Sequence, residues 1–119
     1  MDHPRILVAE DEAIIAMDLC MTVEEAGCRV EGPHRDVSSA MLALQIAKPD
    51  LAILDVQLSD GKVYPLARKL MEENVPVIFH SGEVSSDEMR AMFPDAIACE
   101  KPCPPNEILA RVEQALAAH

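Results

Sequence analysis

The chain has 119 residues, half of them apolar and about a quarter charged, the composition of one soluble globular domain rather than a disordered chain. Lys and Arg number 10 against 21 Asp and Glu, so the formal net charge is −11. This charge repels a phosphate backbone, and few aromatic side chains are present to stack on bases, so we expect no direct contact with nucleic acid.

The sequence shows no targeting or membrane segment. Residues 1–5 lack the basic region of a signal peptide, and no apolar run is long enough to cross a bilayer. We therefore expect a cytoplasmic protein with no membrane partner. The cysteines form no CxxC pair, and no second Cys or His pair completes a zinc tetrahedron, so reduced thiols are expected at Cys20, Cys28, Cys99 and Cys103.

Short apolar runs alternate with longer amphipathic stretches along the chain. The short runs predict strands at residues 5–9, 28–32, 51–54, 76–79 and 96–99. The third run has no polar alternation, which is typical of a strand buried on both faces. Residues 56–62, which follow it, are expected to form a loop.

A helix is expected after each strand, at residues 13–26, 36–47, 64–73, 85–94 and 104–118. Asp36 is the predicted cap of the second helix, and Ser85 with Glu88 forms a capping box for the fourth. In the first helix, which Gly27 ends, the buried face is expected at Ile15, Leu19, Val23 and Ala26.

Five strands that each precede a helix predict an α/β fold of (βα)5 type. The expected sheet is doubly wound, parallel and flavodoxin-like, with strand order 2-1-3-4-5. No repeat, low-complexity segment or long linker interrupts the pattern. We therefore expect residues 1–119 to form one domain, with no output domain in this chain.

Polar residues follow the strands where their carboxyl ends would share one edge of the sheet. Glu10 and Asp11 follow the first strand and Asp55 the third, while the fourth is followed by Ser81 and Gly82 and the fifth by Lys101. Taken singly, each could be a helix cap, a turn residue or a solvated lysine. Together they predict a site, because a carboxylate that ends so apolar a strand as residues 51–54 is costly unless it is paired.

Clustered carboxylates favour a hard cation with oxygen ligands, and we expect Mg²⁺. Such a cation would assist an attack by Asp55 on a phosphoryl group and the formation of an aspartyl phosphate. Lys101 would neutralise one phosphoryl oxygen, the Ser81 hydroxyl would bind another, and Gly82 would leave access open.

These residues, in this order and spacing, resemble the receiver (CheY-like) domains of two-component response regulators over nearly the whole chain. The resemblance implies that Asp55 is phosphorylated and that Asp11 binds Mg²⁺ directly. It also implies that Glu10 acts through metal-bound water, that Gln57 lends its backbone carbonyl to the metal, and that Ser81 and Lys101 are the switch hydroxyl and lysine. A cis Lys101–Pro102 bond is expected too.

The resemblance implies a signalling role rather than an enzyme. A sensor histidine kinase or phosphotransfer protein would be the phosphodonor, and a downstream protein would bind the face formed by residues 85–118. Residues 79–83 resemble a variant of the Phe-Ala-Thr-Gly-Tyr motif of a branch of often single-domain bacterial receivers. Ala98 departs from the family, because most members have a Tyr or Phe there whose ring rotates on phosphorylation.

Two alternatives remain at this stage. One is a pseudo-receiver, an interaction module that keeps the fold without phosphoryl switching. The other is a magnesium-dependent phosphatase that forms an aspartyl phosphate. The phosphatase motif needs a second Asp two residues after the first, and that position is Gln57.

Overall fold

The parallel sheet at the centre of the molecule agrees with the predicted order of strands. The computed structural model describes residues 3–82 and 87–118, without the side chains of residues 87 and 88. In sequence order the sheet contains β1 (Arg5–Ala9), β2 (Arg29–His34), β3 (Leu51–Leu54), β6 (Val77–Ser81) and β7 (Ile97–Glu100). Their spatial order is β2-β1-β3-β6-β7, all parallel, as predicted for a flavodoxin-like fold.

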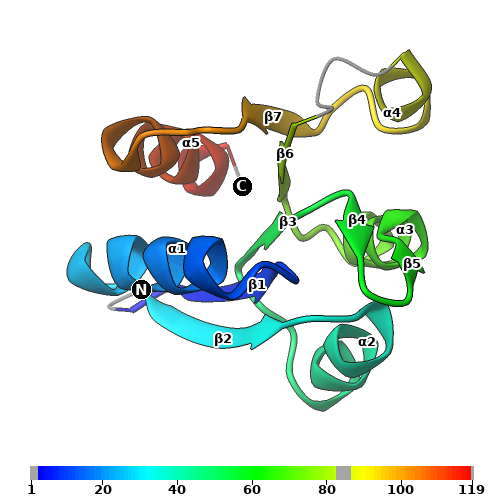
Figure 1. Ribbon diagram of the computed structural model, residues 1–119, viewed down its shortest axis with the longest axis horizontal. Coiled ribbons are helices and arrows are strands. Elements are labelled where there is room, and N and C mark those ends of the chain that lie inside the picture. Colours follow the sequence, from blue (N-terminus) through cyan, green and yellow to red (C-terminus); the bar gives the residue numbers. More distant parts are fainter. Residues whose placement is uncertain (1–2, 83–86, 119) are drawn as a thin grey trace.

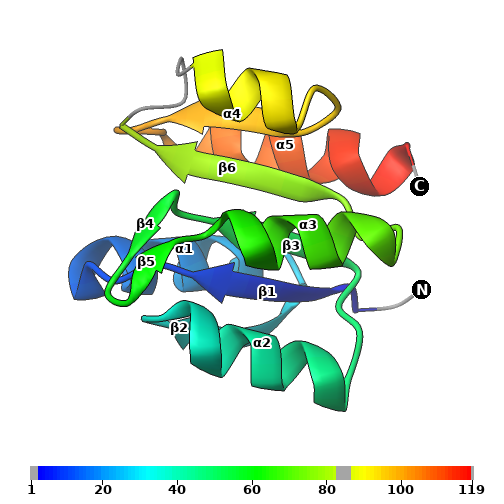
Figure 2. The same ribbon diagram turned by 90° about the vertical axis from the view of Figure 1, so that its right-hand side faces the viewer.

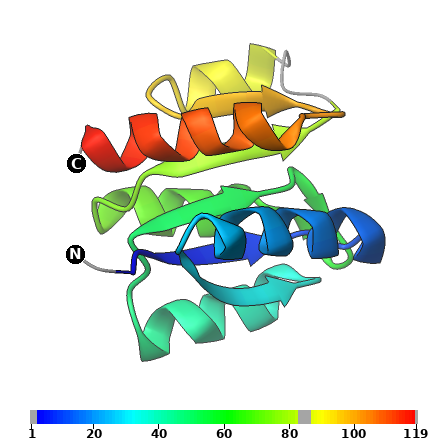
Figure 3. The ribbon, with the colours of Figure 1, turned by 90° about the vertical axis from the view of Figure 1, so that its left-hand side faces the viewer.

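Helices cover both faces of this sheet (Figure 1). One face carries α1 (Ala13–Glu25) and α5 (Pro105–Ala117), which lie side by side in Figure 3. The other face carries α2 (Val37–Ile46), α3 (Tyr64–Glu72) and α4 (Asp87–Met92), shown in front of the sheet in Figure 2. The structure therefore has the three layers expected of a doubly wound fold.

Each helical layer closes its own hydrophobic core over the sheet. Side chains alternate along β3, so Leu54 packs into the core under α2, α3 and α4, and Ile53 packs into the core under α1 and α5. All four residues of β3 are buried, as its unbroken apolar run predicts. This strand holds the carboxyl edge of the sheet in a fixed position for the residues that follow it.

The buried face of α1 differs from the predicted one. Leu19 and Val23 are buried as expected, but Ile15 is only half-buried and Ala26 is exposed. The positions that complete the buried face are Ala16 and Cys20. The prediction followed the larger side chains, whereas the close approach of this helix to the sheet selects smaller ones. Gly27 ends the helix with φ at 93°, as predicted.

Residues 56–62, predicted to be a loop, form a small hairpin of β4 (Gln57–Leu58) and β5 (Gly61–Lys62). Leu58 is buried in the core, and Gly61 turns the chain with φ at 137°. The hairpin also caps α2, because the Asp60 carboxylate accepts hydrogen bonds from the backbone N–H groups of Val37 (2.7 Å) and Ser38 (3.2 Å). Asp36 caps the same helix as predicted, by accepting from Ser39 N at 2.7 Å.

The fourth helix begins at Asp87 in the part of the chain that is described. The predicted capping box depends on Ser85, which lies outside the described residues, as does the start of the predicted partner face. Among the described helices, none combines the length and apolar character needed to span a membrane.

Candidate functional site

The acidic residues meet at the carboxyl edge of the sheet, as the sequence predicts. Glu10 and Asp11 directly follow β1, and Asp55 follows β3, which pairs with β1 in parallel register. A hydrogen bond of 2.9 Å from Asp55 N to the Ala9 carbonyl extends this pairing by one residue. One carboxylate oxygen from each of the three acids lies within 4.8 Å of the others.

Lys101 brings a positive charge to two of these acids. Its Nζ lies 2.8 Å from Glu10 Oε1 as an ion pair and donates a hydrogen bond of 3.0 Å to Asp55 Oδ2. The backbone positions the side chain, because Lys101 N donates to the Ser81 carbonyl at 3.1 Å just beyond the β6–β7 pairing. The Lys101–Pro102 bond is cis, as expected, and a second cis bond, Gly32–Pro33, was not predicted.

Burial makes the charges of this cluster interact strongly. Glu10 is only 1% exposed, and burial, only partly opposed by Lys101, raises its pKa to about 7. Burial disfavours the ammonium of Lys101, but the hydrogen bonds and charges of Glu10 and Asp55 outweigh it and raise the pKa of Lys101. Glu10 Oε1 is buried without a well-directed hydrogen bond, and among the described residues it is the Lys101 ammonium that pairs with it. The cluster thus favours a cation at this position.

Ser81 and Gly82 lie at the end of the neighbouring strand. Ser81 is the last residue of β6 and is buried, opposite Glu100 in the pairing with β7. Gly82 is exposed, and a Cβ built there would meet no atom of the described residues within 4 Å. Both residues therefore border the acidic cluster on the β6 side.

Gln57, two residues after Asp55, contacts the Asp55 carboxylate with its backbone N–H group. Its N–H donates a long hydrogen bond of 3.4 Å to Asp55 Oδ1, and its side-chain amide donates to the Leu58 carbonyl at 3.1 Å. The hairpin that begins at Gln57 thus starts at the site. Figure 2 shows it at the same end of the sheet as the tips of β1 and β6.

His80 is a polar residue of the site region that the sequence analysis missed. It is buried in β6, and its Nδ1 has no hydrogen-bond partner among the described residues. Burial and then the charge of Lys101 lower its pKa, so the ring is kept neutral. His80 and Lys101 both line a groove of about 860 Å³ between α1 and α5. Only its place between Phe79 and Ser81 in a buried strand could have indicated its burial.

Residue 98 itself has no aromatic ring, but all three aromatic rings of the chain lie next to Ala98. Ala98 pairs with Phe79 across β6 and β7, and the Tyr64 and Phe79 rings have centroids 6.5 Å apart. Phe93 packs against both rings, at 5.7 Å from Tyr64 and 5.5 Å from Phe79. The core next to the predicted switch region is therefore filled by rings from other elements.

The profile of the response regulator receiver domain matches residues 6–113. The chain belongs to this family. Receiver domains are modules of two-component signalling, and they generally bind Mg²⁺ in an acidic pocket that corresponds to the cluster of Glu10, Asp11 and Asp55. The strand order and the position of the acids thus agree with the resemblance read from the sequence.

Individual relatives of this receiver domain support the assignment. It is 34% identical over 114 residues to the phyllosphere-induced regulator PhyR of Methylorubrum extorquens, which covers 93% of this chain and 43% of that protein. It is 43% identical over 54 residues to the transcriptional regulatory protein PdtaR of Mycobacterium tuberculosis, 45% of this chain and 26% of that protein. The crystal structure of PhyR from Brucella abortus has a TM-score of 0.81 at 29% identity and covers 98% of this chain and 49% of that one. The chain therefore spans half or less of the length of these relatives.

The donor atoms of the receiver site fit a hard divalent cation. Carboxylate oxygens are ligands that Mg²⁺ prefers, and three of them converge here from two adjacent strands. Lys101 already places one positive charge against Glu10 and Asp55, which shows that the buried carboxylates accept a cation at this position.

Proposed function

We propose that this receiver domain accepts one phosphoryl group on Asp55, from a histidine kinase or a phosphotransfer protein in the cytoplasm, and signals by protein–protein contact. The observation that carries the proposal is the position of Asp55. Its carboxylate ends a fully buried strand, lies 3.0 Å from Lys101 Nζ and shares a 4.8 Å cluster with Glu10 and Asp11.

In the proposed reaction, an oxygen of Asp55 bonds to phosphorus while the bond from phosphorus to the donor imidazole breaks. Asp11, Asp55 and the backbone carbonyl of Gln57 would hold Mg²⁺, with Glu10 acting through water; the ion would reduce the repulsion between the carboxylate and the phosphoryl oxygens. Lys101 neutralises a second phosphoryl oxygen, and the Ser81 hydroxyl donates a hydrogen bond to a third. The leaving imidazole takes up a proton from solvent.

The same residues suggest how the phosphoryl group changes the surface. In the unphosphorylated protein, Lys101 Nζ contacts Glu10 at 2.8 Å and Asp55 at 3.0 Å. A phosphoryl group adds negative charge beside Lys101 and Ser81, which draws these side chains toward it. Since Ser81 precedes the segment of residues 85–118 and Lys101 lies within it, we propose this segment as the contact surface for the downstream protein.

The phosphodonor protein must place its phosphohistidine over the acidic cluster, so its docking surface must lie at the same edge. The first turns of α1, directly after Glu10 and Asp11, expose Ile14 (78%), Met17 (60%) and Met21 (52%). Their spacing places these three side chains on one side of the helix. We propose that this apolar stripe packs against the helices of the phosphodonor.

Incubation with acetyl phosphate and Mg²⁺, followed by intact-mass measurement, tests the phosphoacceptor role. We expect a gain of one phosphoryl mass that EDTA prevents. No gain in mass from acetyl phosphate or a protein donor would favour the pseudo-receiver. Rapid release of phosphate from many unrelated phosphate esters, without accumulation of the phosphorylated protein, would favour the phosphatase.

A variant of the apolar stripe separates the docking surface from the chemistry at Asp55. Met17→Glu places a charge in the apolar stripe and should slow phosphotransfer from a protein donor while labelling by acetyl phosphate stays unchanged. Leu42→Glu, on the exposed surface of α2, is the matched control and should affect neither reaction. Equal transfer to both variants would contradict the proposed docking surface.

A further inference from the structure

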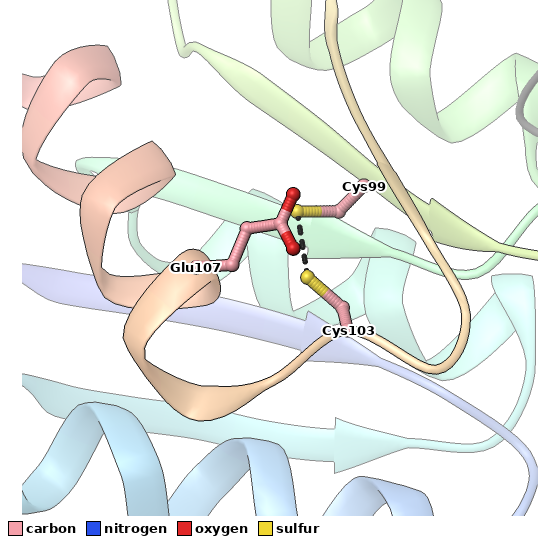
Figure 4. A group of neighbouring side chains, drawn as sticks. All are labelled: Cys99, Cys103 and Glu107. Atoms are coloured by element: carbon pink, nitrogen blue, oxygen red, sulfur yellow. Dashed lines mark hydrogen bonds between the residues drawn. The ribbon is translucent and has the colours of Figure 1, made fainter.

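A second cluster of ligand-type side chains lies near the site but outside the proposed reaction. It contains Cys99, the last residue but one of β7, Cys103, in the loop before α5, and Glu107, in the first turn of α5. One donor atom from each lies within 4.8 Å of the others. Figure 4 shows the two sulfur atoms turned toward each other, with the Glu107 carboxylate beside them.

The two sulfur atoms are in direct contact. The thiol of Cys103 donates a hydrogen bond to Cys99 Sγ, and the two sulfurs are 3.0 Å apart. Cys99 is buried, only 1% exposed, whereas Cys103 is half-buried and lines the groove of about 860 Å³ between α1 and α5. A small thiol reagent in this groove can therefore reach Cys103, with Cys99 directly behind it.

We propose that Cys99 and Cys103 are a reversible redox pair whose oxidation to an intramolecular disulfide restrains the segment that carries Lys101. A low-molecular-weight disulfide is the oxidant class that the groove can admit. The Cys103 thiolate attacks one of its sulfurs and releases one small thiol. The Cys99 thiolate then attacks Cys103 Sγ and releases the second small thiol. The two protein thiols lose two protons and two electrons, and both pass to the two small thiols.

The geometry favours a disulfide over a metal site. Closing the sulfurs from 3.0 Å to a bond of about 2.05 Å needs a small movement, whereas tetrahedral Zn²⁺ with Zn–S bonds of about 2.3 Å would push them about 3.8 Å apart. The third donor is also engaged elsewhere, since the Glu107 side chain is 47% exposed and pairs with Arg111 at 3.7 Å. A pair of thiols in contact is therefore better suited to oxidation than to ligation.

The Cys103 thiol is protonated at neutral pH. Burial, and then the neighbouring Cys99, raise the pKa of Cys103 to about 12, so the thiolate is scarce at neutral pH. Exchange with a small disulfide is therefore slow at neutral pH and faster under alkaline conditions. The pair would respond to sustained oxidation rather than to brief exposure.

The bridge would act on the receiver site through Lys101, which lies between the two cysteines. Lys101 is already held at its backbone by Ser81 and at its Nζ by Glu10 and Asp55. A disulfide would fix the chain on both sides of it and oppose the movement of its side chain toward an incoming phosphoryl group. This part rests on the proposed function, and we expect the oxidised protein to be phosphorylated severalfold more slowly than the reduced one.

The test begins without a phosphodonor, so that its result does not depend on phosphorylation of Asp55. The Cys20→Ala/Cys28→Ala variant, which keeps only Cys99 and Cys103, is treated with oxidised glutathione at mildly alkaline pH and analysed by intact mass. We expect the mass of the protein to fall by that of two hydrogen atoms, with no glutathione adduct attached. Dithiothreitol should restore the original mass. The matched Cys99→Ala/Cys103→Ala variant, which lacks both cysteines of the proposed disulfide, should keep its mass. Cys103→Ser, which keeps Cys99 without its partner, should form no intramolecular disulfide at Cys99.

Three outcomes would overturn the proposal. The first is a stable glutathione adduct on Cys103 that Cys99 does not displace. The second is tight binding of one Zn²⁺ to the reduced variant in native mass spectrometry, lost in Cys103→Ser, with thiols that resist the oxidant. The third is a bridged protein that acetyl phosphate labels as fast as the reduced form, which would remove the effect on Lys101 even where phosphorylation of Asp55 itself stands.

Discussion

Two clusters of three ligand-type side chains lie close to Lys101 in space or in sequence, yet they favour different chemistry. Glu10, Asp11 and Asp55 form one, and Cys99, Cys103 and Glu107 form the other; in both, three donor atoms lie within 4.8 Å of one another. The first offers only oxygens and already has a lysine charge against two of them. The second has two sulfurs in contact. Proximity alone therefore does not define a site; the donor atoms and the nearby charge do.

Burial acts on both clusters in the same direction but with different consequences. It raises the pKa of Glu10 to about 7 and is the main cause that raises the pKa of Cys103 to about 12. The carboxyl group therefore titrates near neutral pH, and a cation at the site shifts that balance. The thiol stays protonated there, so only a chemical reaction changes it. The carboxylate cluster is suited to fast, charge-driven change, and the thiol pair to slow covalent change.

The largest effect is expected from removing the phosphoacceptor. Asp55→Asn should abolish labelling by acetyl phosphate, because the amide is not a nucleophile toward phosphorus under these conditions. Intact-mass measurement checks this. Asp95→Asn is the matched control, because Asp95 is exposed in the turn before β7, at the end of the sheet opposite the site. This variant should be labelled on Asp55 as the wild type is. Labelling that persists in Asp55→Asn would move the acceptor to another residue.

Removing the lysine charge should lower the stability of the metal-free protein. In Lys101→Met, two clustered carboxylates lose their cation, and we expect the free energy of unfolding at neutral pH with EDTA to fall by about 3 kcal/mol. Mg²⁺ should restore part of the loss, because it supplies positive charge to the same oxygens. Urea denaturation measures both. In Lys62→Met, which removes an exposed lysine of the hairpin, stability should change little; a comparable fall there would contradict the assignment.

The carboxylate cluster should also show a pH signature of Glu10. Its pKa is raised from 4.5 in the unfolded chain to about 7 in the folded one, so the folded state holds the proton more tightly. The contribution of protonated Glu10 to the free energy of unfolding is therefore fully present below pH 4.5 and is lost as the pH rises toward 7. In EDTA, the wild type should lose stability relative to Glu10→Gln across this window. Parallel pH profiles of the two proteins would show that Glu10 is not the titrating group.

The smallest effect is expected at the thiol cluster under reducing conditions. Cys103→Ser should be labelled by acetyl phosphate at the wild-type rate in dithiothreitol, because the thiol contacts none of the acids of the carboxylate cluster in any hydrogen bond or ion pair of the described residues. A clear slowing of the reduced variant would mean that the two clusters are coupled even without oxidation, and the distinction between them would weaken.

The order of elements and the acidic edge of the sheet could be predicted from the sequence because both depend on local patterns. Apolar runs of strand length alternate with helical periodicity, and the carboxyl ends of parallel strands share one edge. Glu10, Asp11 and Asp55 were therefore expected together, and the structure brings them within 4.8 Å. Lys101 was expected beside them, and it pairs with Glu10 and Asp55.

Tertiary packing decided what local patterns could not express. Ala16 and Cys20, rather than Ile15 and Ala26, face the sheet, because the spacing between helix and strand determines which side chains fit. The hairpin at residues 57–62 forms because the Leu58 side chain packs into the core. The contact between Cys99 and Cys103 likewise depends on how the chain returns from β7 into α5 around Lys101 and Pro102. Sequence spacing identifies the residues available to a site, but distances of a few ångströms are decided only when distant elements pack together.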